Sequence, residues 1–225
     1  IARCSEALSV NPSSDAAHGL LSQIHTADGK YAEAMAEAEK AVQARKDEPT
    51  YWRTLGNAAY GLARETQDAE LAKRPKAEIE AGGGEVARLT DVRDRSLERA
   101  RSAFQQVVRL APTQKEGYDR QGDVAYLQAR ILADKDAERS AEFYREAADQ
   151  YRRGYGLQRP NYREAFQLGV CSLRLKNLAE AQQYLEQSVE ISAQEDVNPK
   201  ESFWYLGEIL QAQGKLPEAL RYWEK

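Results

Sequence analysis

The chain has 225 residues, of which 42% are hydrophobic and 30% are charged. Because 36 acidic residues outnumber 32 basic ones and give a net charge of -4, no overall positive field exists to attract nucleic acid or anionic lipid. No uncharged apolar stretch approaches the ~18 residues that cross a bilayer, and residues 1–10 lack the layout of a signal peptide. We therefore expect no nucleic-acid partner, no membrane insertion and a cytoplasmic location, or a periplasmic or organellar one if the full-length protein carries a targeting segment.

The first complete pattern along the chain is that of two amphipathic helices. The first helix has small or apolar residues at i, i+3, i+4 and i+7, namely Ala17, Leu20, Leu21 and Ile24. Asp28, Gly29 and Lys30 interrupt this pattern, which then resumes at Ala34, Ala38, Ala41 and Val42. The predicted structure is a helix, a tight turn and an antiparallel helix.

Residues of the same type recur at later positions. Leu21 recurs as Leu55, 34 positions further on. Near the end of the chain, the repeated positions are 38 residues apart. The first set is Leu168, Gly169, Leu178, Ala181 and Leu185, and the matching set is Leu206, Gly207, Leu216, Ala219 and Trp223. Such a period is typical of an array of helix pairs that bury their apolar faces against their neighbours.

The spacing is stretched in the second unit. From Leu55 to Leu97 there are 42 residues where the other units have 10, so 32 residues are inserted. The flanks of Gly82–Gly84 are rich in helix formers, which predicts an extended helical hairpin that reverses at these glycines, with a kink or break at Pro75. Its arms carry mostly charged residues, Arg93 among them, so we expect the tip to be weakly stabilised.

A second stretch lies in the third unit. Gln121 to Leu168 spans 47 residues instead of 34. The aromatic and basic segment 151–157 predicts an extended second helix that ends at a glycine-rich loop.

Several residues resemble the tetratricopeptide repeat family, whose pattern is W-x2-L-G-x2-Y, then A-x3-F, then P. Trp52 to Gly56 matches the opening of the pattern, and Ala100 with Phe104 matches the middle. The terminal proline is matched by Pro12, Pro112 and Pro160, while the units depart from the pattern at His18, Lys46 and Gln121. The resemblance covers nearly the whole chain. It implies an all-α, right-handed superhelical solenoid of antiparallel helix pairs, with the extended hairpin inserted in its second unit.

The resemblance also implies a single array over residues 1–225. We place a half-repeat at 1–12, followed by units at 13–48, 49–112 with the insert at 65–96, 113–160, 161–195 and, incomplete, 198–225.

No set of residues has the pattern of a catalytic, cofactor or metal site. His18 and His25 are seven apart rather than at i, i+4, and both fill aromatic positions of the repeat. The Gly82–Gly84 run lacks the Gly-Lys-Ser/Thr of a phosphate loop, and segment 134–145 has Arg where a calcium loop needs Gly and Glu. The two cysteines are expected to be small buried residues. We expect no enzyme activity, no cofactor and no metal.

The resemblance further implies a groove lined by the first helix of each unit. Carried over position by position, the lining is Gln23, Arg53, Asn57, Tyr60, Arg120, Asp123, Tyr126, Arg163, Phe166, Gln167, Trp204, Tyr205 and Glu208. Aromatic residues and arginine are enriched at interface hot spots. Arg53 and Asn57 also match part of the carboxylate clamp with which some members hold the C-terminal carboxylate of chaperones. Anion recognition by Arg53, Arg120 and Arg163 is a wider form of this idea, and the alternative is an ordinary solvated helix face.

The sequence thus predicts a non-catalytic scaffold that binds a peptide or protein segment in its concave groove. Self-association through the array ends or the 62–100 hairpin is a further expected contact. The alternative is the targeting or regulatory region of a larger enzyme, because the chain lacks an initiator Met and stops at Lys225 partway through a helical pattern. RNA binding would need a basic groove and a repeated base-reading code, and the mixed charges argue against both.

Overall fold

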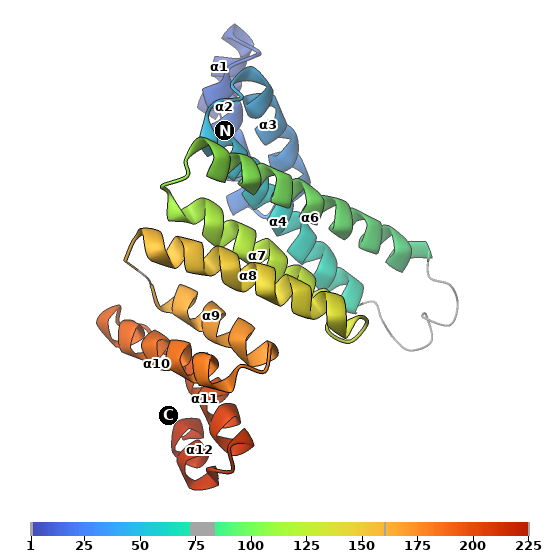
Figure 1. The fold of residues 1–225 in the computed structure, drawn as a ribbon. Coiled ribbons are helices and arrows are strands. Elements are labelled where there is room, and N and C mark those ends of the chain that lie inside the picture. The colour runs from blue at the N-terminus through green and yellow to red at the C-terminus, as the bar shows by residue number, and fades with distance from the viewer. Residues whose placement is uncertain (1, 73–83, 160, 225) are drawn as a thin grey trace. The chain divides into compact units, whose positions relative to one another are not determined.

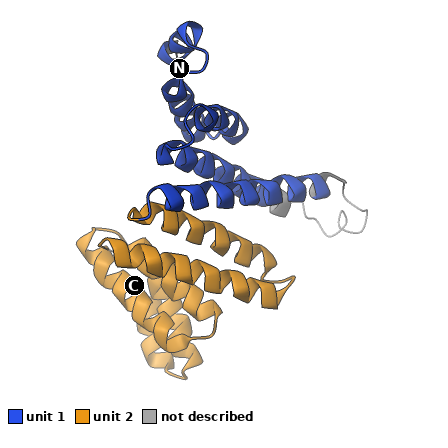
Figure 2. Cartoon of the chain, turned by 45° about the horizontal axis from the view of Figure 1, so that its top comes forward, with its two compact units in different colours: residues 1–112 blue, residues 113–225 orange. Residues whose placement is uncertain are grey.

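The described part of the protein consists of α-helices joined by turns. The computed structural model describes residues 2–72, 84–159 and 161–224. Within these ranges there are eleven helices and no strand (Figure 1). They belong to two compact units, residues 1–112 and 113–225 (Figure 2). The predicted all-α fold of paired helices is confirmed.

The first unit contains one short helix followed by longer ones. Its helices are α1 (Ala2–Val10), α2 (Asp15–Ala27), α3 (Tyr31–Ala44), α4 (Pro49–Ala72) and α6 (Gly84–Leu110). Helix α2 packs against α3, and α4 packs against α6 along much of its length. Because α3 and α2 also contact α4, the second pair packs onto the first.

The second unit contains three pairs. Its helices are α7 (Lys115–Leu132), α8 (Ala137–Leu157), α9 (Tyr162–Arg174), α10 (Leu178–Gln194), α11 (Lys200–Ala212) and α12 (Leu216–Trp223). Figure 1 shows α7 beside α8, then α9 with α10, then α11 with α12. Contacts of α8 with α9 and of α10 with α11 join successive pairs. The first helices of the three pairs are therefore α7, α9 and α11.

Glycine turns and a side-chain cap mark several helix ends. Gly29 and Gly214 have φ angles of 74° and 76°, in the left-handed region open to glycine, at the turns after α2 and α11. At the start of α9, the Asn161 side chain accepts from the Glu164 backbone N–H at 3.0 Å, and the Glu164 carboxylate accepts from the Asn161 backbone N–H at 3.2 Å. This capping box fixes the first turn of α9.

Glycines in the first helices leave room for large side chains of the second helices. A Cβ at Gly122 of α7 would lie 2.6 Å from Cε1 of Tyr151 on α8, and one at Gly56 of α4 would overlap the ring of Phe104 on α6. Any side chain at these positions would push the paired helices apart. Close approach of the two helices therefore depends on glycine.

Two long helices include the described parts of the predicted insert at 65–96. Helices α4 and α6 contain 24 and 27 residues, whereas α2 contains 13. Of the predicted reversal at Gly82–Gly84, only Gly84 is described, as the first residue of α6, and Pro75 lies outside the described residues. Arg93, one of the charged residues of the arms, is 3% exposed and donates to Gln67 Oε1 at 2.9 Å, so the arms pack together at this level.

The stretched segment of the third predicted unit is helical through its glycines. Helix α8 continues to Leu157, so Gly154 and Gly156 lie within the helix and not in the predicted glycine-rich loop. Tyr151 is 2% exposed and belongs to the core of this unit. Gly154 is also buried, and a Cβ there would overlap the Asp119 carboxylate of α7. Tertiary packing outweighs the low helix propensity of glycine here.

Candidate partner-binding surface of the second unit

Most of the predicted partner-contacting residues lie on the first helices of the second unit. We call this set the α7–α9–α11 surface; its residues are Arg120, Asp123, Tyr126, Arg163, Phe166, Gln167, Trp204, Tyr205 and Glu208. The surface has a charged part in the first half of α7 and at the start of α9, and an aromatic part on α9 and α11. These two parts differ in burial and in hydrogen bonding.

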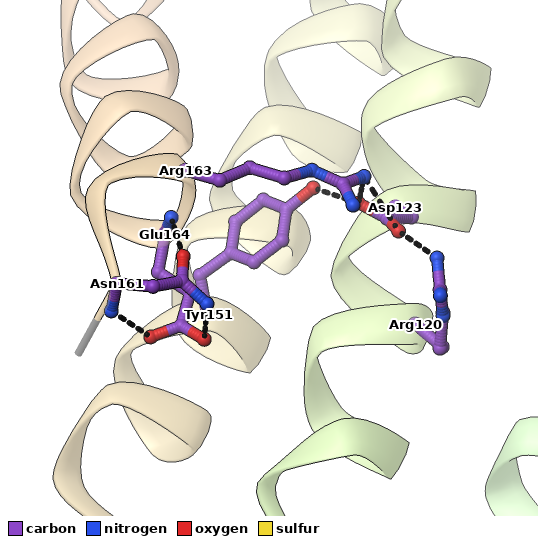
Figure 3. A network of polar contacts seen from close by, with 6 residues as sticks. All are labelled: Arg120, Asp123, Tyr151, Asn161, Arg163 and Glu164. Atoms are coloured by element: carbon purple, nitrogen blue, oxygen red, sulfur yellow. Dashed lines mark hydrogen bonds and ion pairs between the residues drawn. The ribbon is translucent and has the colours of Figure 1, made fainter. Parts of the chain in front are cut away.

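The charged part is centred on Asp123 (Figure 3). Its carboxylate, 5% exposed, accepts from the Tyr151 hydroxyl at 2.9 Å. Arg163 reaches across from α9 and donates from Nη2 to both carboxylate oxygens at 3.1 Å, while Arg120 Nη1 lies 3.2 Å from Oδ2. The charges of Arg120 and Arg163 therefore offset a buried negative charge of the protein itself.

A second buried carboxylate lies beside the first. Glu164, with a side chain 5% exposed, accepts from Lys115 Nζ at 2.5 Å and from Asn161 Nδ2 at 2.9 Å. Lys115 is the first residue of α7 and Asn161 caps α9. These bonds tie the beginning of α9 to the beginning of α7. The positions of Arg163 and Asp123 are fixed as a result.

A small polar cavity of about 170 Å³ adjoins both carboxylates. Asp119 Oδ1 and Gln167 Oε1 are buried there, and neither has a hydrogen-bond partner among the described residues. Burial, followed by the negative charge of Glu164, raises the pKa of Asp119 to about 7. Asp119 therefore changes its charge near neutral pH.

The aromatic part of the surface contains ring pairs packed at a tilt and one exposed ring. The Phe166 ring of α9 lies 5.8 Å from that of Tyr205 on α11, with an interplanar angle of 49°. Trp204 is 57% exposed, packs 6.0 Å from the Trp223 ring, and donates from Nε1 to Glu208 Oε1 at 3.2 Å. An exposed tryptophan held in place by neighbours offers a large apolar area to a partner.

A larger hollow of about 680 Å³ lies in the same unit, and its charged residues were not among those predicted from the sequence. We call it the Arg130–Arg174 hollow; its lining is Tyr126, Arg130, Ala133, Asp134, Ala137, Ser140, Ala141, Tyr144, Arg174 and Tyr205. Tyr126 and Tyr205 also belong to the predicted surface. Arg130 follows Tyr126 by one helical turn, and Arg174 follows Phe166 by two turns. That spacing is the signal that would have found both arginines.

The remaining predicted residues lie in the first unit. Gln23 is exposed on α2, whereas Arg53, Asn57 and Tyr60 are partly buried on α4. Helices α2 and α4 are in contact, so these residues belong to neighbouring first helices of that unit.

The histidines and cysteines of the described chain sit in packing positions. His18 is 5% exposed, with Nδ1 2.6 Å from Glu37 Oε2 and Nε2 2.9 Å from the Pro12 carbonyl oxygen. Both cysteines are buried, and burial raises the pKa of the Cys171 thiol to about 12, so that it stays protonated.

Among the described residues no cluster of three or more His, Cys, Asp or Glu is arranged to hold a metal ion. Nor is any helix in this part long and apolar enough to cross a membrane.

Models of the tetratricopeptide repeat family match two parts of the sequence. One matches residues 1–49 and another matches residues 165–195. The protein is a tetratricopeptide repeat protein. No curated protein sequence matches the chain significantly.

Several solved structures resemble this tetratricopeptide repeat protein. MamA from Desulfovibrio magneticus RS-1, residues 41 to the end, is 15% identical over 93% of this chain and 91% of that chain, with a TM-score of 0.65. YrrB, described as "a TPR protein with an unusual peptide-binding site", is 14% identical over 97% and 88%, with a TM-score of 0.61. TTC0263 from Thermus thermophilus is 17% identical over 93% and 88%, with a TM-score of 0.58. At these identities the similarity shows the fold alone.

Proposed function

We propose that this protein is a non-catalytic scaffold that binds a segment of another protein on the α7–α9–α11 surface. The observation that carries the proposal is Trp204, which is 57% exposed on a first helix although it packs against Trp223. Large apolar side chains in such positions are typical of interaction sites. A partner that covers the Trp204 ring removes apolar area from water.

Preorganisation supports the same surface. The tilted rings of Phe166 and Tyr205 already pack against each other, and Trp204 is held by its hydrogen bond to Glu208. Ordered side chains lose little conformational entropy when a partner binds, so more of the contact energy appears as affinity. Tryptophan, tyrosine and arginine are also the residues that dominate measured hot spots.

The charged part of the surface has a positioning role in this proposal. Arg120, Asp123 and Arg163 form a network that holds α7 and α9 in register. Gln167 lines the cavity beside this network, and its buried oxygen has no hydrogen-bond partner among the described residues. In the first unit, Gln23, Arg53, Asn57 and Tyr60 extend the set of proposed contacts. The peptide-binding site described for YrrB, a protein of similar fold, agrees with a peptide ligand.

Peptides selected from a displayed library against the intact chain test this proposal. We expect Trp204→Ala to weaken the selected peptides about tenfold or more, because truncated hot-spot residues cost more than ~1 kcal/mol. Leu157→Ala is the matched control. Leu157 is a large apolar residue, 40% exposed, on α8, outside the α7–α9–α11 surface.

Two results would decide against the surface. One is an equal loss of affinity in the Trp204 and Leu157 variants. The other is peptide binding that leaves the fluorescence emission of Trp204 unchanged, judged by difference from Trp204→Phe, since a covered tryptophan emits at shorter wavelength. Retained helix content in both variants excludes unfolding as the cause.

Self-association through α12 is a second proposed contact. Leu216 and Leu220, one turn apart, are 50% and 49% exposed and form an apolar strip on this helix. Sedimentation equilibrium is expected to show a concentration-dependent dimer for the wild type and a monomer for Leu216→Lys/Leu220→Lys. A wild type that stays monomeric at every concentration would contradict this contact.

A further inference from the structure

The two arginines of the Arg130–Arg174 hollow are not part of any ion pair among the described residues. Among the described residues, no carboxylate lies within ion-pair distance of Arg130 or Arg174. Asp134 is the acidic residue of the lining, so two positive charges face one negative charge. Arg130 and Arg174 are both exposed. A solvent-open hollow with excess positive charge attracts anionic groups.

The tyrosines of the hollow add uncharged donors. The Tyr126 and Tyr144 rings meet edge to face at 5.8 Å, which fixes their orientation. Burial raises the pKa of both phenols, so their hydroxyls keep their protons at neutral pH. A protonated phenol donates a hydrogen bond to an anion. Ser140 adds no donor, because its hydroxyl already donates to the Ala129 carbonyl at 2.8 Å.

Stabilisation of helix ends is the competing explanation for the two arginines. Arg130 lies in the last turn of α7 and Arg174 is the last residue of α9, where a positive charge interacts favourably with the helix dipole. That role accounts for a basic residue at each helix end. It leaves unexplained why both ends open into one hollow, together with three tyrosines and fewer acidic than basic groups.

We propose that the Arg130–Arg174 hollow binds the carboxylate side chains of an acidic segment in the partner protein. The inference rests on the proposed function, since this segment belongs to the protein that the α7–α9–α11 surface binds. Tyr126 and Tyr205 line the hollow and belong to that surface, so one bound segment contacts both. Guanidinium groups hold carboxylates through paired, charge-assisted hydrogen bonds. A volume of about 680 Å³ lies within the ~300–1,000 Å³ of small-molecule sites, so it accommodates a side chain with its flanking backbone.

A fluorescence-anisotropy titration with the intact 225-residue chain tests the proposal directly. The probe is an oligoglutamate peptide with a dye at its amino end and an amide at its carboxyl end, so that all its carboxylates are on side chains. An oligoglutamine peptide of the same length is the uncharged comparison. We expect Arg130→Gln/Arg174→Gln to weaken oligoglutamate binding at least about tenfold.

The matched control removes the same number of charges elsewhere. Arg139 and Arg153 are exposed on α8, on the face opposite to Ala141 and Tyr144 by helical periodicity. Arg139→Gln/Arg153→Gln is expected to change oligoglutamate binding by less than about twofold, because isolated surface charges contribute little.

A milder variant keeps the test valid if the double variant fails to fold. Tyr126→Phe removes one hydroxyl and keeps the ring, and we expect binding about two- to threefold weaker. Thermal melts followed by circular dichroism report the fold of each variant. An unchanged affinity in Tyr126→Phe, together with an unchanged affinity in a folded Arg174→Gln, would overturn the proposal.

Other outcomes separate the hollow from the scaffold. Equal weakening by the two arginine double variants, or no oligoglutamate binding by the wild type, would overturn the hollow. Binding only of a peptide with a free C-terminal carboxylate would overturn the choice of side-chain carboxylates. If the affinity of a selected peptide depends on Trp204 but not on Arg130 and Arg174, the hollow is rejected as a binding site and the proposed scaffold function is retained. Oligoglutamate binding that depends on these arginines, with no dependence of selected peptides on Trp204, would support the hollow and reject the Trp204 surface.

Discussion

Two pairs of arginines in the second unit have the same chemistry and different surroundings. Helix α7 supplies Arg120 and Arg130, and α9 supplies Arg163 and Arg174. Arg120 and Arg163 share the buried carboxylate of Asp123, whereas Arg130 and Arg174 open into a hollow without an ion-pair partner in the described chain. The neighbours of an arginine, more than its place on a helix, decide whether its charge is available to a partner.

The physical reason is the burial of Asp123. A buried carboxylate needs opposite charge and hydrogen-bond donors, and Arg120, Arg163 and Tyr151 supply them. A carboxylate of a partner would have to displace one that is already in place. At Arg130 and Arg174 the corresponding competitor is Asp134, which lines the hollow but forms no ion pair with either arginine.

The largest expected effect comes from breaking the paired cluster. Asp123→Ala leaves the Tyr151 hydroxyl without its acceptor and two arginines without their shared partner. Because the arginines are partly exposed, we expect a loss of about 2–3 kcal/mol in the free energy of unfolding, below the ~3–5 kcal/mol of a fully buried pair. Urea denaturation measures this loss.

An exposed ion pair provides the control for that measurement. Asp149, with a side chain 65% exposed, pairs with Arg152 at 3.2 Å on α8. Asp149→Ala is expected to change the free energy of unfolding by less than about 0.5 kcal/mol. A loss in Asp123→Ala no larger than that of the control would show that the cluster does not hold α7 to α9.

The ionisation of Asp119, in the cavity beside the Asp123 cluster, makes the stability of the protein depend on pH. Its pKa is raised to about 7, mainly by burial and then by Glu164, so the folded protein keeps a proton that the unfolded chain releases above pH ~4. Stability from this group is present below pH ~4 and declines as the pH rises toward about 7. Asp119→Asn should therefore be more stable than the wild type at pH 8, by about 1 kcal/mol after a discount for partial exposure.

Thermal unfolding between pH 4 and pH 8 checks this prediction. The slope with pH should be smaller in Asp119→Asn than in the wild type. The nearby charges of Lys115, Asp123 and Glu164 are the same in both proteins, so the difference isolates Asp119. A variant that is less stable than the wild type at pH 8 would contradict the account of this cavity.

The smallest expected effect is a gain in affinity for the acidic probe. Asp134 is the acidic residue of the Arg130–Arg174 hollow, so Asp134→Asn should tighten oligoglutamate binding, by about two- to threefold. Anisotropy titrations at low and raised salt measure the change, which should shrink as salt screens the charges. Weaker binding in this variant would count against electrostatic attraction in the hollow.

The spacing of apolar and small residues along the sequence predicted the fold. Residues at helical spacing share one face of a helix, and they are buried when that face packs against a neighbouring helix. Leu55 and Leu168 are fully buried, and Gly56 faces a ring of the paired helix, as the repeat implied. The glycines of α8 were misplaced, because Gly154 is helical for a reason outside its own segment, namely its packing against Asp119. Local sequence does not encode that contact.

The candidate site was harder to predict, because charge depends on partners that are distant in sequence. Arg163 and Asp123 are 40 positions apart, so their pairing required the structure. Arg130 and Arg174 occupy helix ends, where a basic residue has an ordinary stabilising role, so their residue type alone does not indicate a binding site. Their helical spacing from Tyr126 and Phe166 places them near the predicted surface, and their shared hollow indicates a second role.

One helix allows the central claim to be tested with two single variants. Arg163 and Arg174 stand at opposite ends of α9, are both exposed, and are changed to Gln in the same way. Oligoglutamate affinity, measured by anisotropy on folded variants of the intact chain, should fall about fivefold in Arg174→Gln and less than about twofold in Arg163→Gln. A greater loss in Arg163→Gln than in Arg174→Gln would contradict the claim that the arginines without a counter-ion are the ones that bind the partner.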